Sequence, residues 1–182
     1  MASPMPRIRH EWRRALPLEA PPKRSDSCAG LKLRRPAQGD AEALGELLLD
    51  AYRGTIDYEG EDLAAATGVV RDFFAGKEYP PDIAASVVAW RGPTPAAFCM
   101  IAEWQARSCR FVEYVATRSG EKRRGVGRLV LGESLRRLSR AGHPEVRAVI
   151  TLGNTASDAL FRRLGFEDLG PLGPRPGTPP KA

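Results

Sequence analysis

Apolar residues recur along the chain at two spacings, and these spacings predict a mixed α/β domain. Alternating or short continuous apolar runs, typical of β-strands, mark residues 31–34, 86–90, 96–104, 110–117, 146–152 and 166–169. Apolar residues three and four positions apart, typical of helices with one buried face, mark residues 40–52, 61–75, 126–141 and 155–164. The predicted order, β-αα-βββ-α-β-α-β, indicates a mixed sheet with helices on its faces.

Proline and charge set the two ends of the chain apart from its middle. Five prolines stand among charged residues in 1–29, and five more lie in 171–182. This composition predicts a disordered leader over 1–29, with room for a short helical turn at Trp12 and Leu16, and an unstructured tail over 171–182. Residues 30–170 are predicted to form one domain.

Positive charge gathers at the start of the chain. The formal net charge is +6. Residues 1–35 hold nine Lys or Arg and three Asp or Glu, whereas the residues after them hold nineteen of each. A short basic segment interrupted by prolines does not favour nucleic-acid binding, which needs a basic face on a docking element.

Neither a membrane segment nor a secretory signal is visible. No apolar run approaches the ~20 residues of a membrane helix, and the start of the chain lacks the apolar core of a signal peptide. The sequence therefore predicts a cytoplasmic protein. Its three cysteines, Cys28, Cys99 and Cys109, form no C-x-x-C pair, so we expect buried thiols and no disulfide or metal site.

A glycine-rich turn joins the strand at 110–117 to the helix at 126–141. It runs from Lys122 to Arg128, with Gly125 and Gly127 two positions apart. Glycines let backbone N–H groups approach an anion closely, and the start of a helix adds unpaired N–H groups and partial positive charge. The turn therefore predicts a pyrophosphate site. Neither the dinucleotide fingerprint nor the P-loop pattern is met, and a plain loop with solvated arginines stays open.

A second landmark follows the strand at 146–152. Asn154 comes directly after a break in the chain, and residues 155–158, Thr-Ala-Ser-Asp, have the form of a capping box that opens a helix. Gly165 ends this helix, and Phe166 returns the chain to a strand.

Together the two segments resemble the motifs of the GNAT acetyltransferase superfamily. The cofactor motif of that family, Gln/Arg-x-x-Gly-x-Gly/Ala, is matched by Lys122, Gly125 and Gly127. The next motif, Asn-x-x-Ala-x-x-Leu-Tyr-x-x-x-Gly-Phe, is matched from Asn154 onwards, with Ser157 in place of the alanine and Phe161 in place of the tyrosine. Lys122 keeps the charge of arginine and loses its planar fork.

The resemblance implies acetyl-CoA as cosubstrate and a GNAT-like fold. This fold is a mixed, mostly antiparallel central sheet flanked by helices, with a splay between the strands at 110–117 and 146–152. The pantetheine arm would run along the splay, held by backbone groups of Ala116 and Thr117 and lying beside Asn154. The implied pyrophosphate site is formed by Lys122, Arg123, Arg124, Gly125, Val126, Gly127 and Arg128.

Several side chains are candidates for proton transfer. The family tyrosine protonates the leaving thiolate, and Phe161 cannot do so. Tyr114 is the nearest candidate acid, and Glu113 and Glu103 are candidate bases. Neighbouring strand residues point to opposite faces, so Glu113 and Tyr114 would share a cleft only if a bulge intervened. An ordinary structural role stays open for each of them.

The resemblance further implies the reaction. Four carboxylates in the loop at 57–62 would favour a cationic amine as acceptor. We therefore expect transfer of acetyl from acetyl-CoA to a primary amine of a small molecule, peptide or protein. The alternative, which Phe161 favours, is a non-catalytic acyl-CoA-binding regulatory module of the same fold. A monomer and a homodimer both stay open.

Overall fold

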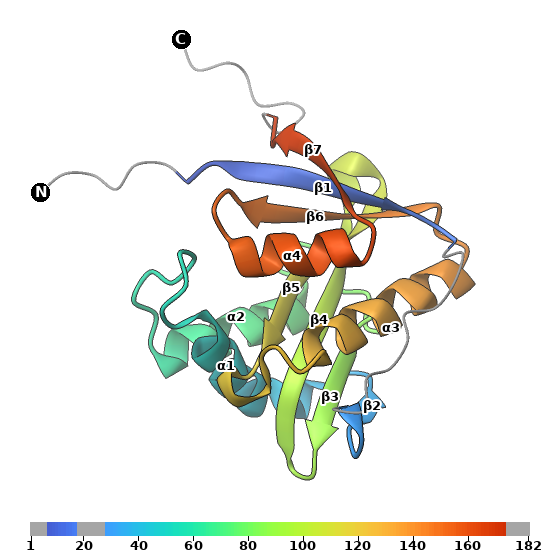
Figure 1. Ribbon diagram of the computed structural model, residues 1–182. Helices are drawn as coiled ribbons and strands as arrows, with labels where there is room; N and C mark the ends of the chain where they lie inside the picture. The colour runs from blue at the N-terminus through green and yellow to red at the C-terminus, as the bar shows by residue number, and fades with distance from the viewer. Residues whose placement is uncertain (1–6, 18–27, 174–182) are drawn as a thin grey trace, which may run out of the picture.

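The computed structural model describes residues 7–17 and 28–173 (Figure 1). Their seven strands form one sheet in the order β2-β3-β4-β5-β6-β1-β7. The strands are β1 (Arg9–Ala15), β2 (Lys32–Arg34), β3 (Val87–Arg91), β4 (Thr94–Trp104), β5 (Cys109–Thr117), β6 (Glu145–Thr151) and β7 (Glu167–Pro171). The α-helices are α1 (Ala41–Tyr52), α2 (Leu63–Ala75), α3 (Val126–Arg140) and α4 (Thr155–Arg163).

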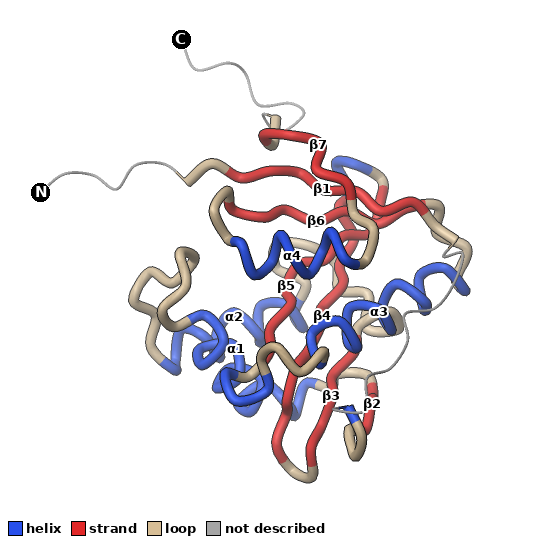
Figure 2. Tube along the Cα trace, viewed as in Figure 1, coloured by secondary structure: helices blue, strands red, loops and turns tan. Residues whose placement is uncertain are grey.

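The sheet is antiparallel except where β5 meets β6. These two strands pair in parallel over three residues, from Arg110–Val112 to Val146–Ala148. Beyond Val112, β5 continues to Thr117 without β6 beside it, and Figure 2 shows the two strands diverging. The predicted mostly antiparallel sheet with a splay between its two central strands is therefore confirmed.

Two apolar cores lie on opposite faces of the sheet. One core is formed by α1 and α2 against strand residues such as Phe98, Met100 and Phe111. The other is formed by α3 and by Phe161 of α4, against residues such as Val87. The amphipathic patterns of the helices bury the expected faces, and their predicted bounds agree with the structure to within about two residues.

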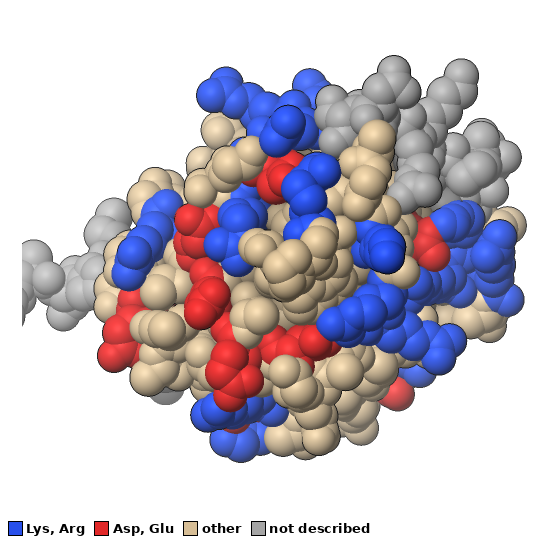
Figure 3. Space-filling view, turned by 90° about the horizontal axis from the view of Figure 1, so that it is seen from below, with Lys and Arg blue, Asp and Glu red and all other residues tan. Residues whose placement is uncertain are grey.

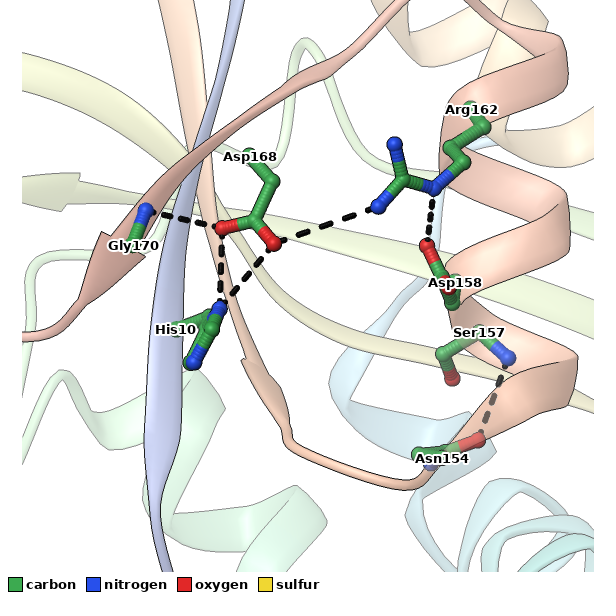
Figure 4. Close-up of polar contacts among 7 residues, drawn as sticks. All are labelled: His10, Asn154, Ser157, Asp158, Arg162, Asp168 and Gly170. Carbon is green, nitrogen blue, oxygen red and sulfur yellow. Dashed lines mark hydrogen bonds and ion pairs between the residues drawn. The ribbon is translucent and has the colours of Figure 1, made fainter.

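The predicted disordered leader is wrong for residues 9–15, which form β1 between β6 and β7. Trp12 is 3% exposed, and the Arg162 guanidinium lies 4.7 Å from the centre of its ring. His10 Nδ1 lies 3.0 Å from an Asp168 carboxylate oxygen and so joins β1 to β7 (Figure 4). The helical turn expected at Trp12 is a strand, and the folded domain therefore begins well before residue 30.

The remaining parts of the predicted leader and tail are only partly described. Residues 1–6, 18–27 and 174–182 lie outside the described residues, while Pro171 still belongs to β7. Across the described stretches, no helix combines the length and the hydropathy that crossing a membrane requires.

Candidate active site

A groove of about 1480 Å³ opens where β5 and β6 separate. Its floor is the part of β5 that has no β6 beside it, from Glu113 to Thr117. One end is formed by the turn at 122–128, and the opposite wall by β6 and α4. The groove therefore follows the splay between the two halves of the sheet.

The glycine-rich turn has the backbone shape that the sequence predicts. Arg123 and Gly125 have φ angles of 61° and 83°, and α3 begins at Val126. Gly125 is the N-cap and offers no side chain to the first N–H groups of α3, which lack partners inside the helix. Each residue from Lys122 to Arg128 lines the groove. These N–H groups and the helix dipole are suited to an anion.

A close approach to Thr117 of β5 also favours glycine at residue 127. A Cβ atom at this position would lie 2.8 Å from Thr117 Oγ1, closer than real Cβ atoms approach a neighbour. A side chain at residue 127 would therefore require Thr117 or the start of α3 to shift. The glycine lets the turn lie close to the floor of the groove.

The end of α1 holds the turn in place. The Asp50 carboxylate accepts hydrogen bonds from Ser119, at 2.6 Å from its backbone nitrogen and 3.0 Å from its hydroxyl. Lys122 Nζ donates to the Ala51 carbonyl oxygen at 2.9 Å. Lys122 thus lines the groove, with its ammonium group anchored to α1.

Basic side chains of the turn add charge to this end of the groove. Arg123 and Arg124 are exposed, and one Arg124 nitrogen lies 3.6 Å from Glu121. Viewed from below, a large group of Lys and Arg lies at the right of the face, while Asp and Glu lie mostly in its left and central part, with further Lys and Arg among them (Figure 3). Charges of both signs therefore share this face.

Asn154 lies on the groove wall, as predicted, and both ends of its amide have protein partners. Its Oδ1 accepts from the Ser157 backbone N–H at 3.1 Å and caps α4 (Figure 4). Its Nδ2 donates to Asp57 at 2.6 Å. Because Asp57 belongs to the loop after α1, this bond ties the loop at 53–62 across the groove.

Glu113 and Tyr114 both line the groove. Met100 of β4 pairs with Tyr114, and Ile101 pairs with Val112, so the register between β4 and β5 shifts at Glu113. Such a bulge places two consecutive side chains on the same face of a sheet. The bulge that a shared cleft requires is therefore present, and the Glu113 carboxyl and the Tyr114 phenol lie in one cleft.

Burial changes the acid–base properties of both groups. Burial, together with the nearby Glu78 carboxylate, raises the pKa of Glu113 to about 7. Its Oε2 atom is buried without a hydrogen-bond partner among the described residues. Burial and the carboxylates of Glu113 and Glu78 raise the pKa of Tyr114 to about 12. At neutral pH, Glu113 is poised to exchange a proton and Tyr114 stays neutral.

The other candidates for proton transfer lie in different surroundings. Glu103 is not among the residues that line the groove, and its carboxylate lies 3.1 Å from an Arg110 nitrogen. Ala116 is buried at the groove floor. Phe161 is 2% exposed and packs edge-on against Phe166, with ring centres 4.8 Å apart. The structure therefore brings Glu113 to the cleft and leaves Glu103 outside it.

The groove includes side chains that sequence reasoning missed. Arg7 and Arg9 reach it from the start of the chain, and Glu78, Tyr79 and Trp104 line its far end. The signal for the first two was the charged residue at every second position from 7 to 13, which is typical of a strand with one polar face.

The chain belongs to the acetyltransferase (GNAT) family, because the model of that family matches residues 42–166. The match excludes β1. No curated protein matches the sequence closely enough to count as a relative.

Solved structures of N-acetyltransferases share the fold. A GCN5-related N-acetyltransferase from Sphaerobacter thermophilus has a TM-score of 0.66 and 19% identity, covering 91% of this chain and 50% of that one. This chain thus spans about half the length of that protein. A PaiA N-acetyltransferase from Thermoplasma acidophilum in complex with coenzyme A has a TM-score of 0.61 and 14% identity, covering 75% and 89%.

A third similar structure is the diaminobutyrate acetyltransferase EctA from Paenibacillus lautus, in complex with L-2,4-diaminobutyric acid and coenzyme A. It has a TM-score of 0.55 and 20% identity, covering 74% of each chain. At these identities the likeness concerns the fold.

Proposed function

We propose that this protein transfers the acetyl group of acetyl-CoA to a primary amine, with Glu113 as general base. The observation that carries the proposal is the bulge in β5. It places a carboxylate of near-neutral pKa in the groove, beside the splay, in a chain of the GNAT family. A general base works best when its pKa lies near the operating pH.

The residues present fit acetyl-CoA. The pyrophosphate binds the N–H groups at the start of α3, with Arg123 and Arg124 adding charge. The backbone of 113–117 pairs with β4 on one side and has no β6 strand on the other, so the polar groups on that second side can pair with the amides of the pantetheine arm. This arrangement brings the thioester toward Ala116 and Glu113.

The reaction is a direct transfer. The amine nitrogen attacks the thioester carbonyl carbon, a C–N bond forms, and the C–S bond breaks. The proton of the nitrogen passes to the Glu113 carboxylate, directly or through one water. The sulfur leaves as a thiolate, which a thiol pKa of about 8.5 makes tolerable without an acid. Tyr114 stays a neutral phenol that can donate a hydrogen bond.

The competing proposal is a module that binds acyl-CoA without turnover. Phe161 favours it, because this buried ring has no proton to give the thiolate. The poised carboxyl of Glu113 favours catalysis instead. We also propose a cytoplasmic location, which fits the three free cysteines.

The test is acetyl transfer from labelled acetyl-CoA to a panel of primary amines, followed by mass spectrometry. We expect an acetylated amine and one equivalent of free CoA. A Gly125→Glu, Gly127→Glu variant should lose CoA binding, whereas the control Gly68→Ala, in open space on α2, should keep it. CoA binding without transfer to any amine would favour the non-catalytic module.

A further inference from the structure

Charged residues occupy alternate positions at the start of the chain. Arg7, Arg9, Glu11 and Arg13 are spaced as side chains on one face of a strand are. All but Arg9 have an ion-pair partner. The partners are Glu59 for Arg7 at 2.8 Å, Arg107 and Arg147 for Glu11, and Glu167 for Arg13 at 3.3 Å.

Arg9 differs from these neighbours in two respects. Its guanidinium has no hydrogen bond or ion pair with any residue in 7–17 or 28–173. It also lines the groove, as Glu11 and Arg13 do not. Arg7 lines the groove too, but its guanidinium is paired with Glu59, so Arg9 is the residue of this series that brings an unmatched charge to the groove.

The backbone at Arg9 is held firmly. Arg9 pairs with Thr151 of β6, and its carbonyl oxygen accepts from the Leu172 N–H at 2.7 Å. The backbone of Arg9 is therefore held between β6 and the residue that follows β7, and only the side chain is free to adapt. An arginine on a fixed strand is a pre-organised binding group, because little backbone freedom is lost when a ligand binds.

Arg9 and Glu113 lie on the same face of the sheet. Glu11, two residues from Arg9, pairs with Arg107, whose guanidinium lies 5.5 Å from the centre of the Trp104 ring. Trp104 packs with Tyr114 in the core on the α1 and α2 face. Arg9 thus points to the side on which the bulge places Glu113.

Arg9 and Glu113 lie on strands that are separated in the sheet by β6 alone. Glu113 lies one residue beyond Val112, which pairs with Ala148, and Arg9 pairs with Thr151, three residues beyond Ala148. In a regular sheet, two strand spacings and an offset of two residues would separate their Cα atoms by about 12 Å. The splay widens this gap, and the two side chains reach into it from opposite sides.

We propose that Arg9 binds a carboxylate of the acceptor, so that the acceptor is an aminocarboxylate whose amine lies at Glu113. This inference rests on the proposed acetyl transfer. A guanidinium donates two parallel N–H bonds to the two oxygens of a carboxylate. An amine without a carboxylate has no such oxygens to accept them. Arg9 lies outside the segment that the family model matches, so the match itself assigns this residue no role.

The experiment compares matched acceptors. Amino acids are assayed against the amines that lack only the carboxylate, such as leucine against isopentylamine, and against diamines, with labelled acetyl-CoA. We expect wild type to prefer the amino acid in kcat/KM. Arg9→Gln should lower kcat/KM for the amino acid about 10- to 100-fold, mainly through KM. Arg9→Glu should reverse the preference and favour diamines.

Arg13→Gln is the matched control, since Arg13 lies on the same strand and face and pairs with Glu167 outside the groove. It should keep the wild-type preference, and its Tm should equal that of Arg9→Gln. A wild type that favours the amine or diamine, or an Arg9→Gln variant with an unchanged preference, would overturn the inference alone. Failure to acetylate any amine would overturn the proposed function, and this inference with it.

Discussion

Glu113 and Tyr114 are consecutive residues of β5, and both side chains line one groove. The shift of register between Met100 and Ile101 of β4 produces this arrangement. Without the bulge, the two side chains would point to opposite faces of the sheet. One irregularity of the backbone thus joins a proton acceptor and a phenol at the site where β5 leaves β6.

The raised pKa of Glu113 should make its ionisation destabilising. Its ordinary value is 4.5 and its folded value is about 7, so stability is lost as pH rises through 7. Replacing it by Gln should therefore raise the free energy of unfolding at pH 8 by about 1 kcal/mol, after allowance for its partial exposure. The difference should vanish below pH 4.5. Urea unfolding at both pH values measures it, and a variant no more stable than wild type at pH 8 would contradict the burial of this carboxylate.

Gly127→Ala should strain the contact between α3 and β5. Its Cβ would meet Thr117 Oγ1, so we expect a loss of about 1–3 kcal/mol in thermal unfolding. Adding Thr117→Ala removes that oxygen, and the double variant should be more stable than the sum of the single changes predicts. Gly68→Ala, with open space around its Cβ, serves as the control. Strict additivity would show that the two residues do not meet.

Removing the Trp12 ring from β1 should destabilise the folded domain. Trp12 is buried in the core that also holds Val146 and Phe166, so Trp12→Ala should cost about 3–5 kcal/mol. Ile8→Ala, at a side chain that is 55% exposed, should change stability by less than about 0.5 kcal/mol. Denaturant melts of the two variants compare them. Equal midpoints would mean that β1 contributes little to the folded domain.

Much of the fold follows from the sequence because local patterns determine it. The apolar spacing of α1 to α4 and the glycines at 125 and 127 are local signals, and the structure places them as expected. The sequence predicts the start of the chain wrongly because its charges resemble those of a disordered segment. In the structure these charges form pairs with residues far along the chain, such as Glu11 with Arg147.

The proton acceptor could not be identified from sequence alone. Glu113 and Glu103 both lie in strands among apolar residues and look alike in that setting. What separates them is the pairing of β5 with β4. Glu103 lies directly opposite Arg110 and pairs with it, while Glu113 has no partner in the register and turns into the groove. Register depends on tertiary packing and cannot be deduced from the sequence of a single strand.

The pH dependence of kcat/KM with an accepted amine tests the central claim most directly. Wild-type activity should rise as pH passes through about 7, because the Glu113 carboxyl must lose its proton to act as base. Glu113→Gln should lower kcat/KM at pH 7 by about 10²–10⁴-fold and recover part of it at pH 9, where the amine deprotonates unaided. Glu103→Gln should keep the wild-type profile. A wild-type profile for Glu113→Gln would contradict the assignment of Glu113 as the base.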